Sequence, residues 1–248
     1  MALDAGTLAQ LTEAVSKFVV ERLIPLEAQV AAEDEIPETV ITEMAELGLF
    51  GLTIPAEYGG LGLNTEEECR IVMELGRAAP AFRSIIGTNN GIGSQGLVLH
   101  GTDAQRRFYL PKLASGEITG SFALTEPDAG SDSAAISLRA IADGDDFLLS
   151  GTKRYITNAT RAQLFTVFAR TNPDEKGSRG ISAILVDAST PGISLGSPNK
   201  KMGQQGAHVC DVIFEECRVP QGNIVGGIER LNKGFATAMQ TLDTVSYT

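Results

Sequence analysis

The stretch Phe122-Ala123-Leu124-Thr125-Glu126-Pro127-Asp128-Ala129-Gly130-Ser131-Asp132 joins an apolar strand pattern to a loop rich in proline, glycine and hydroxyl groups. The strand pattern ends at Thr125, and the loop that follows exposes backbone amides and side-chain hydroxyls. Such a loop can hold a polar heterocycle at the strand end and an anionic phosphate on the amides of Gly130 and Ser131. The stretch therefore predicts a ligand-binding turn beside a sheet.

A second segment, Tyr155-Ile156-Thr157-Asn158, offers an aromatic plane at Tyr155 and another hydroxyl at Thr157. A stacking surface, hydrogen-bonding hydroxyls and an anion-binding loop together suit a flavin dinucleotide. A serine-rich turn between two ordinary strands accounts for the same residues. The spacing alone leaves both interpretations open.

Around these segments, the chain from Ile118 to Val219 has the pattern of short strands. Runs rich in β-branched and aromatic residues are bounded by Gly, Pro, Asp and Asn, and Gly144-Asp145-Asp146 predicts a hairpin turn. Several strands without helices between them predict an antiparallel barrel or sandwich. The expected strands include Ile118–Leu124, Phe147–Leu149, Leu164–Phe168, Ile181–Val186 and Val209–Phe214.

Before residue 116, apolar residues recur at helical spacing. Thr65 with Glu68, and Thr102 with Gln105, predict capping boxes at two helix starts. The run Asn232 to Leu242 returns to helical spacing near the end of the chain. The expected helices of the first part cover residues 6–32, 38–48, 65–78, 82–99 and 103–114.

The composition excludes several classes of protein. The 248 residues contain 20 Lys and Arg against 31 Asp and Glu, a formal net charge of −11, which argues against nucleic acid as the main partner. No apolar run reaches the length of a membrane helix, and Met1 to Gln10 show no secretory signal, so we expect a cytoplasmic protein without a membrane span. Three cysteines at unrelated spacings predict free thiols, and two distant histidines predict no metal site.

Three motifs have simpler explanations than the chemistry they suggest. The literal G-x-G-x-x-G of Gly91 to Gly96 lies among helical patterns, so we expect close packing there and not a dinucleotide fold. The S-x-x-K of Ser150 to Lys153 lies in a turn and strand region, which argues against a nucleophilic serine. His100 ends a helical run, where a cation offsets the helix dipole.

The two segments around Thr125 and Tyr155 resemble the two signatures of the acyl-CoA dehydrogenase family. Tyr58-Gly59-Gly60-Leu61-Gly62 resembles its Y-G-G-x-G turn, and further blocks follow in the same order. These are Gly101–Glu117, Lys201–Gly203, Phe214–Pro220 and Gly234–Met239. The resemblance implies an α+β multi-domain protein with an all-α N-terminal domain over 1–116 and an antiparallel β-barrel middle domain over 117–229. Residues 230–248 are then the start of a truncated C-terminal helical domain, with only the first helix of its bundle.

The resemblance also implies roles for single residues. Phe122, Leu124 and Thr125 would line the flavin ring of FAD, with Thr125 bonding its pyrimidine edge. Gly130 and Ser131 would meet the pyrophosphate or the acyl-CoA substrate.

On the second segment, Tyr155 falls where the family often has Trp against the isoalloxazine face. Ile156 would lend backbone contacts, and Thr157 would place its hydroxyl near the hydride-accepting nitrogen N5. Ser178 and Asp243 match positions that touch the substrate, as Ser131 does.

The implied activity is α,β-dehydrogenation of an acyl-CoA thioester to a trans-2-enoyl-CoA, with an electron-transfer flavoprotein as acceptor and a homo- or hetero-oligomeric assembly. Helices 65–78 and 82–99 would wall the acyl pocket. The catalytic Glu of most members is expected in the missing C-terminal part, and the alternative seat for the base holds Val245. Ser246 also replaces the Arg that members usually have.

The sequence leaves several alternatives open. The chain is a truncated gene product, a fragment, or a subunit whose partner supplies the bundle. A non-catalytic FAD- or acyl-CoA-binding subunit that needs a partner chain is the main alternative to the enzyme. Acyl-CoA oxidase, a flavin-dependent monooxygenase of the same superfamily and a purely structural barrel are the others.

Overall fold

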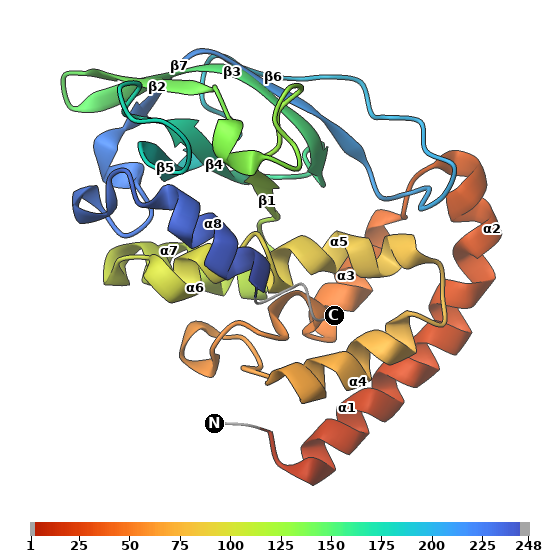
Figure 1. Ribbon diagram of the computed structural model, residues 1–248. Coiled ribbons are helices and arrows are strands. Elements are labelled where there is room, and N and C mark those ends of the chain that lie inside the picture. The colour runs from red at the N-terminus through yellow and green to blue at the C-terminus, as the bar shows by residue number, and fades with distance from the viewer. Residues whose placement is uncertain (1–2, 244–248) are drawn as a thin grey trace.

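The computed structural model describes residues 3–243 and places a curled sheet over a layer of helices (Figure 1). Helices come first along the chain, then strands, then one further helix between the two layers. The helices are α1 (Ala5–Phe18), α2 (Ile24–Glu33), α3 (Glu38–Glu46), α4 (Thr65–Leu75), α5 (Pro80–Asn90), α6 (Gln95–His100), α7 (Asp103–Ala114) and α8 (Gly234–Asp243). The strands are β1 (Gly120–Ala123), β2 (Arg139–Asp143), β3 (Asp146–Thr157), β4 (Leu164–Arg170), β5 (Ile181–Asp187), β6 (Ile193–Leu195) and β7 (Val209–Pro220).

The helix predicted over 6–32 forms, but with an irregular centre. A π-helical turn at Val19–Leu23 separates α1 from α2. Pro25 follows directly, and because proline has no N–H, the carbonyl one turn before it receives no regular helical bond. In the wider turn the N–H of Ile24 bonds the carbonyl of Val19, and the helix continues into α2.

The single helix predicted over 82–99 is wrong, because α5 ends at Asn90 and α6 starts at Gln95. The cause is a close approach of two backbones at Gly93. A Cβ there would lie 2.7 Å from the carbonyl oxygen of Thr88 and 3.0 Å from that of Gly120, the first residue of β1. The glycines of this segment therefore serve packing, as expected, and a helix precedes them in place of the strand that a dinucleotide site needs.

One of the two predicted capping boxes is displaced by one residue. At the start of α4, Asn64 and not Thr65 is the cap: its side chain accepts the N–H of Glu67 at 3.1 Å, and the Glu67 carboxylate accepts the N–H of Asn64 at 2.9 Å. Asn and Thr both serve as N-cap residues, so the sequence alone did not decide whether Asn64 or Thr65 caps the helix. The displaced register leaves Glu68 without a capping role.

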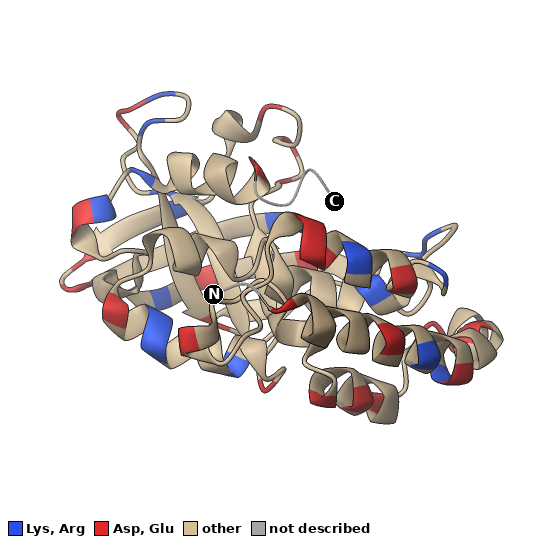
Figure 2. Ribbon diagram, turned by 90° about the horizontal axis from the view of Figure 1, so that it is seen from below, with Lys and Arg blue, Asp and Glu red and all other residues tan. Residues whose placement is uncertain are grey.

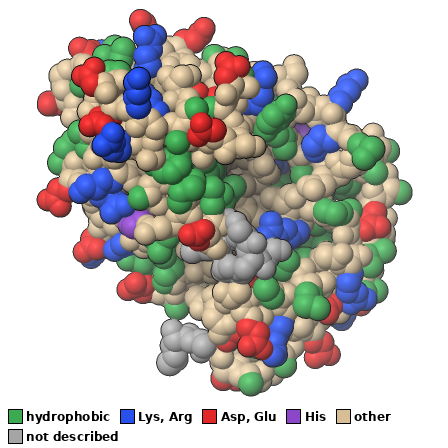
Figure 3. Space-filling view, in the orientation of Figure 1, with side chains coloured by type: hydrophobic (Ala, Val, Ile, Leu, Met, Phe, Trp, Pro, Cys, Tyr) green, Lys and Arg blue, Asp and Glu red, His purple; other side chains and the backbone are tan. Residues whose placement is uncertain are grey.

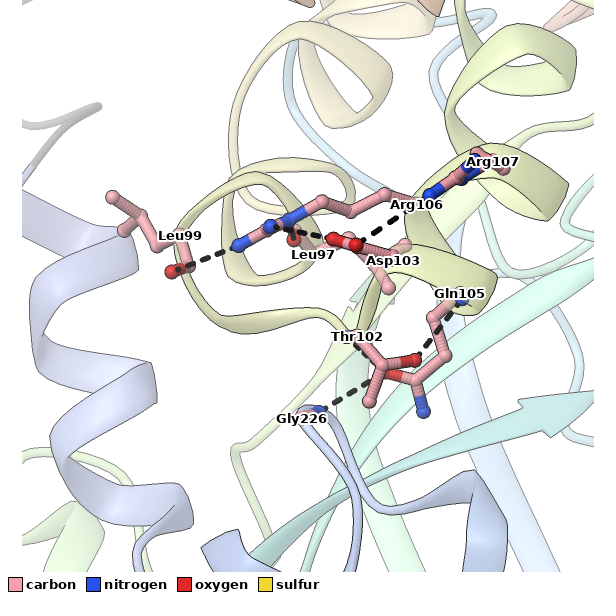
Figure 4. Close-up of polar contacts among 8 residues, drawn as sticks. All are labelled: Leu97, Leu99, Thr102, Asp103, Gln105, Arg106, Arg107 and Gly226. Carbon is pink, nitrogen blue, oxygen red and sulfur yellow. Dashed lines mark hydrogen bonds and ion pairs between the residues drawn. The ribbon is translucent and has the colours of Figure 1, made fainter.

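The second capping box, Thr102 with Gln105, is confirmed at the start of α7 (Figure 4). The side-chain oxygen of Gln105 also accepts the N–H of Gly226 at 3.0 Å, so one amide caps a helix and fixes the chain that leaves the sheet. Arg106 donates to the carbonyls of Leu97 and Leu99 and ties α7 to the end of α6.

The sheet is mixed and open, which corrects the predicted antiparallel barrel. In the part of the chain that the structure describes, the order is β1-β4-β2-β3-β7-β6, and β5 pairs with β4. β1 runs parallel to β4, and β2 meets β4 in parallel at one residue pair. The predicted hairpin is confirmed, since β2 and β3 pair antiparallel around Gly144 and Asp145 with Gly144 at φ 63°. Strands predicted at 147–149 and 209–214 belong to longer strands, β3 and β7.

Buried amides join the helical layer to the sheet. The Asn89 side chain donates to the carbonyls of Leu113 and Ile118 and accepts the N–H of Gly120. The Asn158 side chain donates to the Thr88 hydroxyl of α5 at 2.9 Å. These bonds hold β1 and the end of β3 against α5 and fix the relation of the two layers where their residues line cavities. The predicted domain boundaries at 116/117 and 229/230 stay predictions.

The surface carries charges of both signs. Figure 2 shows the positions of acidic and basic residues along the helices, and Figure 3 shows side chains of both charges among hydrophobic groups on one face. Within residues 3–243, no helix combines the length and the apolar character that crossing a bilayer requires.

Candidate functional site

The two segments that the sequence singled out lie side by side. The N–H of Arg154 donates to the carbonyl of Thr125 at 2.8 Å, and the Ser121 hydroxyl donates to the carbonyl of Thr157 at 2.8 Å. β3 is bulged at this point, because its pairing with β7 shifts register between Lys153 and Ile156. The end of the first segment is thereby fixed against the second.

The bulge aims an aromatic ring away from the sheet. Tyr155 adopts a left-handed backbone conformation, φ 59°, which is uncommon for a bulky residue. Tyr155 is 61% exposed, although it lies within β3 next to the buried Ile156. A regular strand would not present this ring beside the Thr125 turn.

All eight residues predicted to bind the cofactor line one cavity of about 400 Å³. They enter it from β1, the loop after it and the end of β3, and α8 and the α5–α6 turn complete the wall. The predicted residues are Phe122, Leu124, Thr125, Gly130, Ser131, Tyr155, Ile156 and Thr157, and the others are Ile92, Ser133, Met239 and Leu242. We refer to this space as the strand-end cavity.

Two predicted substrate residues do not line this cavity. Ser178 is exposed in the loop between β4 and β5, and Asp243 is exposed at the end of α8. Ser131 does line it, as the sequence predicted for a residue shared by cofactor and substrate. Val245 and Ser246, where the chain departs from the family pattern, lie outside the described residues.

A buried ion pair, which sequence reasoning missed, supports the strand-end cavity. The Lys153 ammonium lies 2.8 Å from the Glu126 carboxylate and 3.0 Å from the Leu124 carbonyl, and the two side chains are 0% and 4% exposed. Glu126 also accepts the N–H groups of Ser137 and Leu138 and the Ser137 hydroxyl. The pair thus ties the Thr125 turn, the loop after it and β3 together.

Burial and charge act in opposite directions on this pair. Burial disfavours the Glu126 carboxylate, but the Lys153 charge and the hydrogen bonds to the carboxylate prevail and hold its pKa below the ordinary value. Burial lowers the pKa of Lys153 to about 8, although Glu126 opposes that change. The sequence carried one signal of this pair: Lys153 occupies an inward-facing position of a strand, and a buried lysine needs a partner that compensates its charge.

Of the two remaining motifs, Ser150 behaves as the sequence indicated. His100 ends a helix as expected, but its lowered pKa disfavours the cation predicted to offset the helix dipole. Ser150 lies within β3, and its hydroxyl oxygen accepts the N–H of Glu216 at 3.2 Å. His100 ends α6 and bonds the Gln240 side chain, and burial lowers its pKa. The cysteines are free thiols, as expected, and burial raises the pKa of Cys217 to about 11. None of these side chains lines the strand-end cavity.

A larger cavity of about 770 Å³ opens between the helical layer and the sheet. α4 and α5, from the two helices expected to wall an acyl pocket, contribute to its wall, and the loop that precedes β7 closes another side. It shares Ile92 and Thr157 with the strand-end cavity, so the two spaces meet at the end of β3. We refer to it as the interlayer cavity.

Comparison with known proteins agrees with this arrangement. Residues 7–117 match the family model of the acyl-CoA dehydrogenase N-terminal domain, and residues 121–217 match that of the acyl-CoA dehydrogenase middle domain. The chain is 40% identical over 235 residues to acryloyl-CoA reductase (NADH) of Anaerotignum propionicum, covering 94% of this chain and 58% of that protein. It is 37% identical over 237 residues to mitochondrial isovaleryl-CoA dehydrogenase of Pongo abelii, covering 94% and 55%.

A solved structure of similar fold is an acyl-CoA dehydrogenase complexed with FAD from Bacillus anthracis. The TM-score is 0.87 at 30% sequence identity, and the alignment covers 98% of this chain and 41% of that one. The chain therefore spans less than two thirds of the length of each of these three proteins.

Proposed function

The chain belongs to the acyl-CoA dehydrogenase family, and from that membership we propose that it acts in the α,β-dehydrogenation of an acyl-CoA thioester to a trans-2-enoyl-CoA. The family consists of FAD-containing oxidoreductases, and the reaction belongs to the CH–CH class. The observation that carries the proposal is the junction of the two cavities at Ile92 and Thr157. A thioester in the interlayer cavity would meet a cofactor in the strand-end cavity at that junction.

The donor set of the strand-end cavity fits FAD. Tyr155 presents an exposed aromatic face, Thr125 and Thr157 present hydroxyls, and Gly130 and Ser131 lie on an exposed loop suited to an anion. A Cβ at Gly130 would meet nothing within 4 Å, so the backbone there is open to a ligand. When bound, FAD supplies the hydride acceptor of the reaction.

The described residues position the reactants and exclude water. Ile92 and Thr157 form the contact between the two cavities, and Phe122 and Leu124 make the floor of the strand-end cavity apolar. Removal of the α-proton needs a base near the reacting carbons. The residues that line the strand-end cavity within 3–243 include no carboxylate. We therefore place the general base, a glutamate in the family resemblance, outside that lining.

The lack of a carboxylate among the described lining residues of the strand-end cavity also favours a second candidate function, a binding subunit. A chain whose cofactor cavity holds no acid among its described lining residues can act as a non-catalytic FAD- and acyl-CoA-binding subunit that needs a partner chain. An electron-transfer flavoprotein as electron acceptor, an oligomeric assembly and a cytoplasmic location belong to this proposal as implications of the family. Substrate contacts of Ser178 and Asp243 also belong to this proposal as implications of the family resemblance, although neither residue lines either cavity.

The test uses the purified chain with added FAD. We expect a retained flavin spectrum that Tyr155→Ala weakens, with Cys69→Ser, outside both cavities, as the control. Anaerobic titration with butyryl-CoA then separates the candidates: bleaching supports the dehydrogenase, and a shifted but unbleached spectrum supports the binding subunit. Failure to bind FAD under any condition would contradict both.

A further inference from the structure

The Arg170 side chain, at the end of β4, uses every N–H group of its guanidinium on backbone carbonyls. An arginine side chain has five such donors in a fixed planar arrangement. The five bonds are 2.9 to 3.1 Å long, and each has its own acceptor. None of the acceptors is a carboxylate. They are the carbonyl oxygens of Ala134, Ile136, Glu175, Gly177 and Arg179.

These acceptors lie on two loops that are distant in the sequence. Two of them belong to the β1–β2 loop, which also carries Ser131 of the strand-end cavity. The other three belong to the β4–β5 loop, which carries Ser178. The terminal nitrogen Nη2 donates to Ala134 at 3.0 Å and to Gly177 at 3.1 Å, one acceptor in each loop. The two backbones therefore meet at this nitrogen, and Arg170 joins the loops into one unit.

The β4–β5 loop is closed at its base and exposed at its tip. The N–H groups of Thr171 and Asn172 donate to the Gly180 carbonyl at 2.8 and 3.1 Å, which closes the base. Residues 176–179 are exposed, and an exposed loop opens easily unless its backbone is tied down. The bonds from Arg170 to the carbonyls at 175, 177 and 179 tie this tip to the side chain that also holds the β1–β2 loop.

The same bonds turn peptide N–H groups outward. In a trans peptide the N–H points opposite to the C=O of the same unit. The carbonyls of Glu175 and Gly177 point at Arg170. The N–H groups that follow them, of Lys176 and Ser178, therefore point away from the guanidinium on an exposed part of the loop. Outward N–H groups beside an exposed lysine suit a phosphate, the anion that CoA carries at its nucleotide end.

Resting on the function proposed above, we propose that Arg170 is a positioning residue for the nucleotide end of the CoA thioester. It does not bind the substrate itself, because all five donors are used within the protein. It acts by holding Ser178 in a fixed relation to Ser131 in the cavity wall. The acyl and pantetheine part of the thioester, which enters the cavities, does not depend on that relation.

The test compares butyryl-CoA with butyryl-pantetheine, which lacks the nucleotide, by calorimetric binding to the full chain with FAD. Arg170→Lys keeps the charge but offers three donors in place of a planar set of five. Loops that adopt their native arrangement about one tenth of the time bind about tenfold more weakly. We therefore expect Arg170→Lys to weaken butyryl-CoA binding about tenfold and to leave butyryl-pantetheine binding unchanged. A merely structural role would weaken both alike.

Arg218→Lys is the matched control, because Arg218 pairs with Asp143 and Asp146 at the β2–β3 hairpin and lines neither cavity. It should change neither affinity. If Arg170→Lys does not fold, hydrogen exchange of the native chain tests the same coupling. Butyryl-CoA should slow exchange in both loops together, and butyryl-pantetheine should leave the β4–β5 loop unchanged.

Three results overturn this inference and leave the dehydrogenase proposal intact. They are an unchanged butyryl-CoA affinity in Arg170→Lys, equal weakening of the two thioesters, and protection of the β1–β2 loop alone by butyryl-CoA. Binding of neither thioester to the native chain contradicts both proposals.

Discussion

The buried pair of Lys153 and Glu126 offers the sharpest test of how the strand-end cavity is held. Replacing Lys153 by methionine keeps a similar length of side chain and removes the ammonium. Glu126 then remains 4% exposed without the charge that lies 2.8 Å away in the native protein. Breaking a buried ion pair in this way costs about 3–5 kcal/mol, since one charge stays buried and uncompensated.

The assay is equilibrium unfolding in urea at neutral pH, followed by far-UV circular dichroism. We expect the free energy of unfolding of Lys153→Met to fall by about 3–5 kcal/mol. The double variant Lys153→Met with Glu126→Gln should recover part of the loss, because it removes the buried charge. Recovery is incomplete because the N–H groups of Ser137 and Leu138 bond different carboxylate oxygens, and the single amide oxygen replaces only one of these acceptors. A single variant as stable as the native chain would refute the account.

Acid pH supplies an independent check with a fixed sign. In the native chain the pKa of Glu126 is lowered, so its contribution to stability is present above its ordinary value of 4.5 and is lost as pH falls through the lowered folded value. In Lys153→Met the charge and hydrogen bond of Lys153 are gone, and only the bonds from Ser137 and Leu138 oppose burial, so we expect the pKa of Glu126 to rise. The difference in stability between the two proteins should therefore shrink as pH falls from 7 toward 4.5. A difference that stays constant over this range would contradict the ion-pair explanation.

Three further predictions concern single positions. Gly93→Ala should destabilise the chain by about 1–3 kcal/mol, measured by urea unfolding, because its Cβ would lie 2.7 Å from the Thr88 carbonyl oxygen. Gln105→Ala should lower the free energy of unfolding by about 1–3 kcal/mol in the same assay, because it leaves the N–H of Gly226 without its acceptor. Tyr155→Asn should raise stability by about 1 kcal/mol, because Asn tolerates φ 59°, yet weaken FAD binding in a fluorescence titration. A destabilised Tyr155→Asn would show that the left-handed residue is not strained.

The helical layer was largely predictable because its signals are local. The cap at Thr102 and the spacing of apolar residues before 116 depend on neighbours within a few positions. The predictions failed where a distant segment decides the outcome. Gly93 breaks the helix expected over 82–99 because β1, far along the chain, approaches its backbone. The sheet is open and mixed because β1 enters parallel to β4, a pairing that no local pattern reports.

The residues that line the strand-end cavity could be predicted, but the buried ion pair that holds them in place could not. Hydroxyls, glycine and an aromatic ring singled out the two segments, the family resemblance implied the eight cofactor residues within them, and the structure brings these residues together. The Lys153–Glu126 pair was missed, since its two members belong to separate segments and neither carries the expected cofactor chemistry. Glu68 was assigned to a cap, and only the register at Asn64 reveals its place in the cavity wall.

The bulge in β3 shows which residue the sheet does not require. Lys153 and Ile156 are both buried, although only two residues lie between them. Residues with that spacing lie on opposite faces of a regular strand. The partner strand passes from Val212 to Cys210 over the same interval with only Asp211 between, so β3 holds one residue more. If Tyr155 is left out of the count, the alternation of β3 becomes regular. The extra residue is thus the exposed aromatic of the cavity. Its strained backbone lies between Arg154, whose N–H bonds the Thr125 carbonyl, and Ile156, which pairs with Cys210. Because the pairing of β3 with β7 gains nothing from that strain, the proposed ligand site is the explanation that we infer for it.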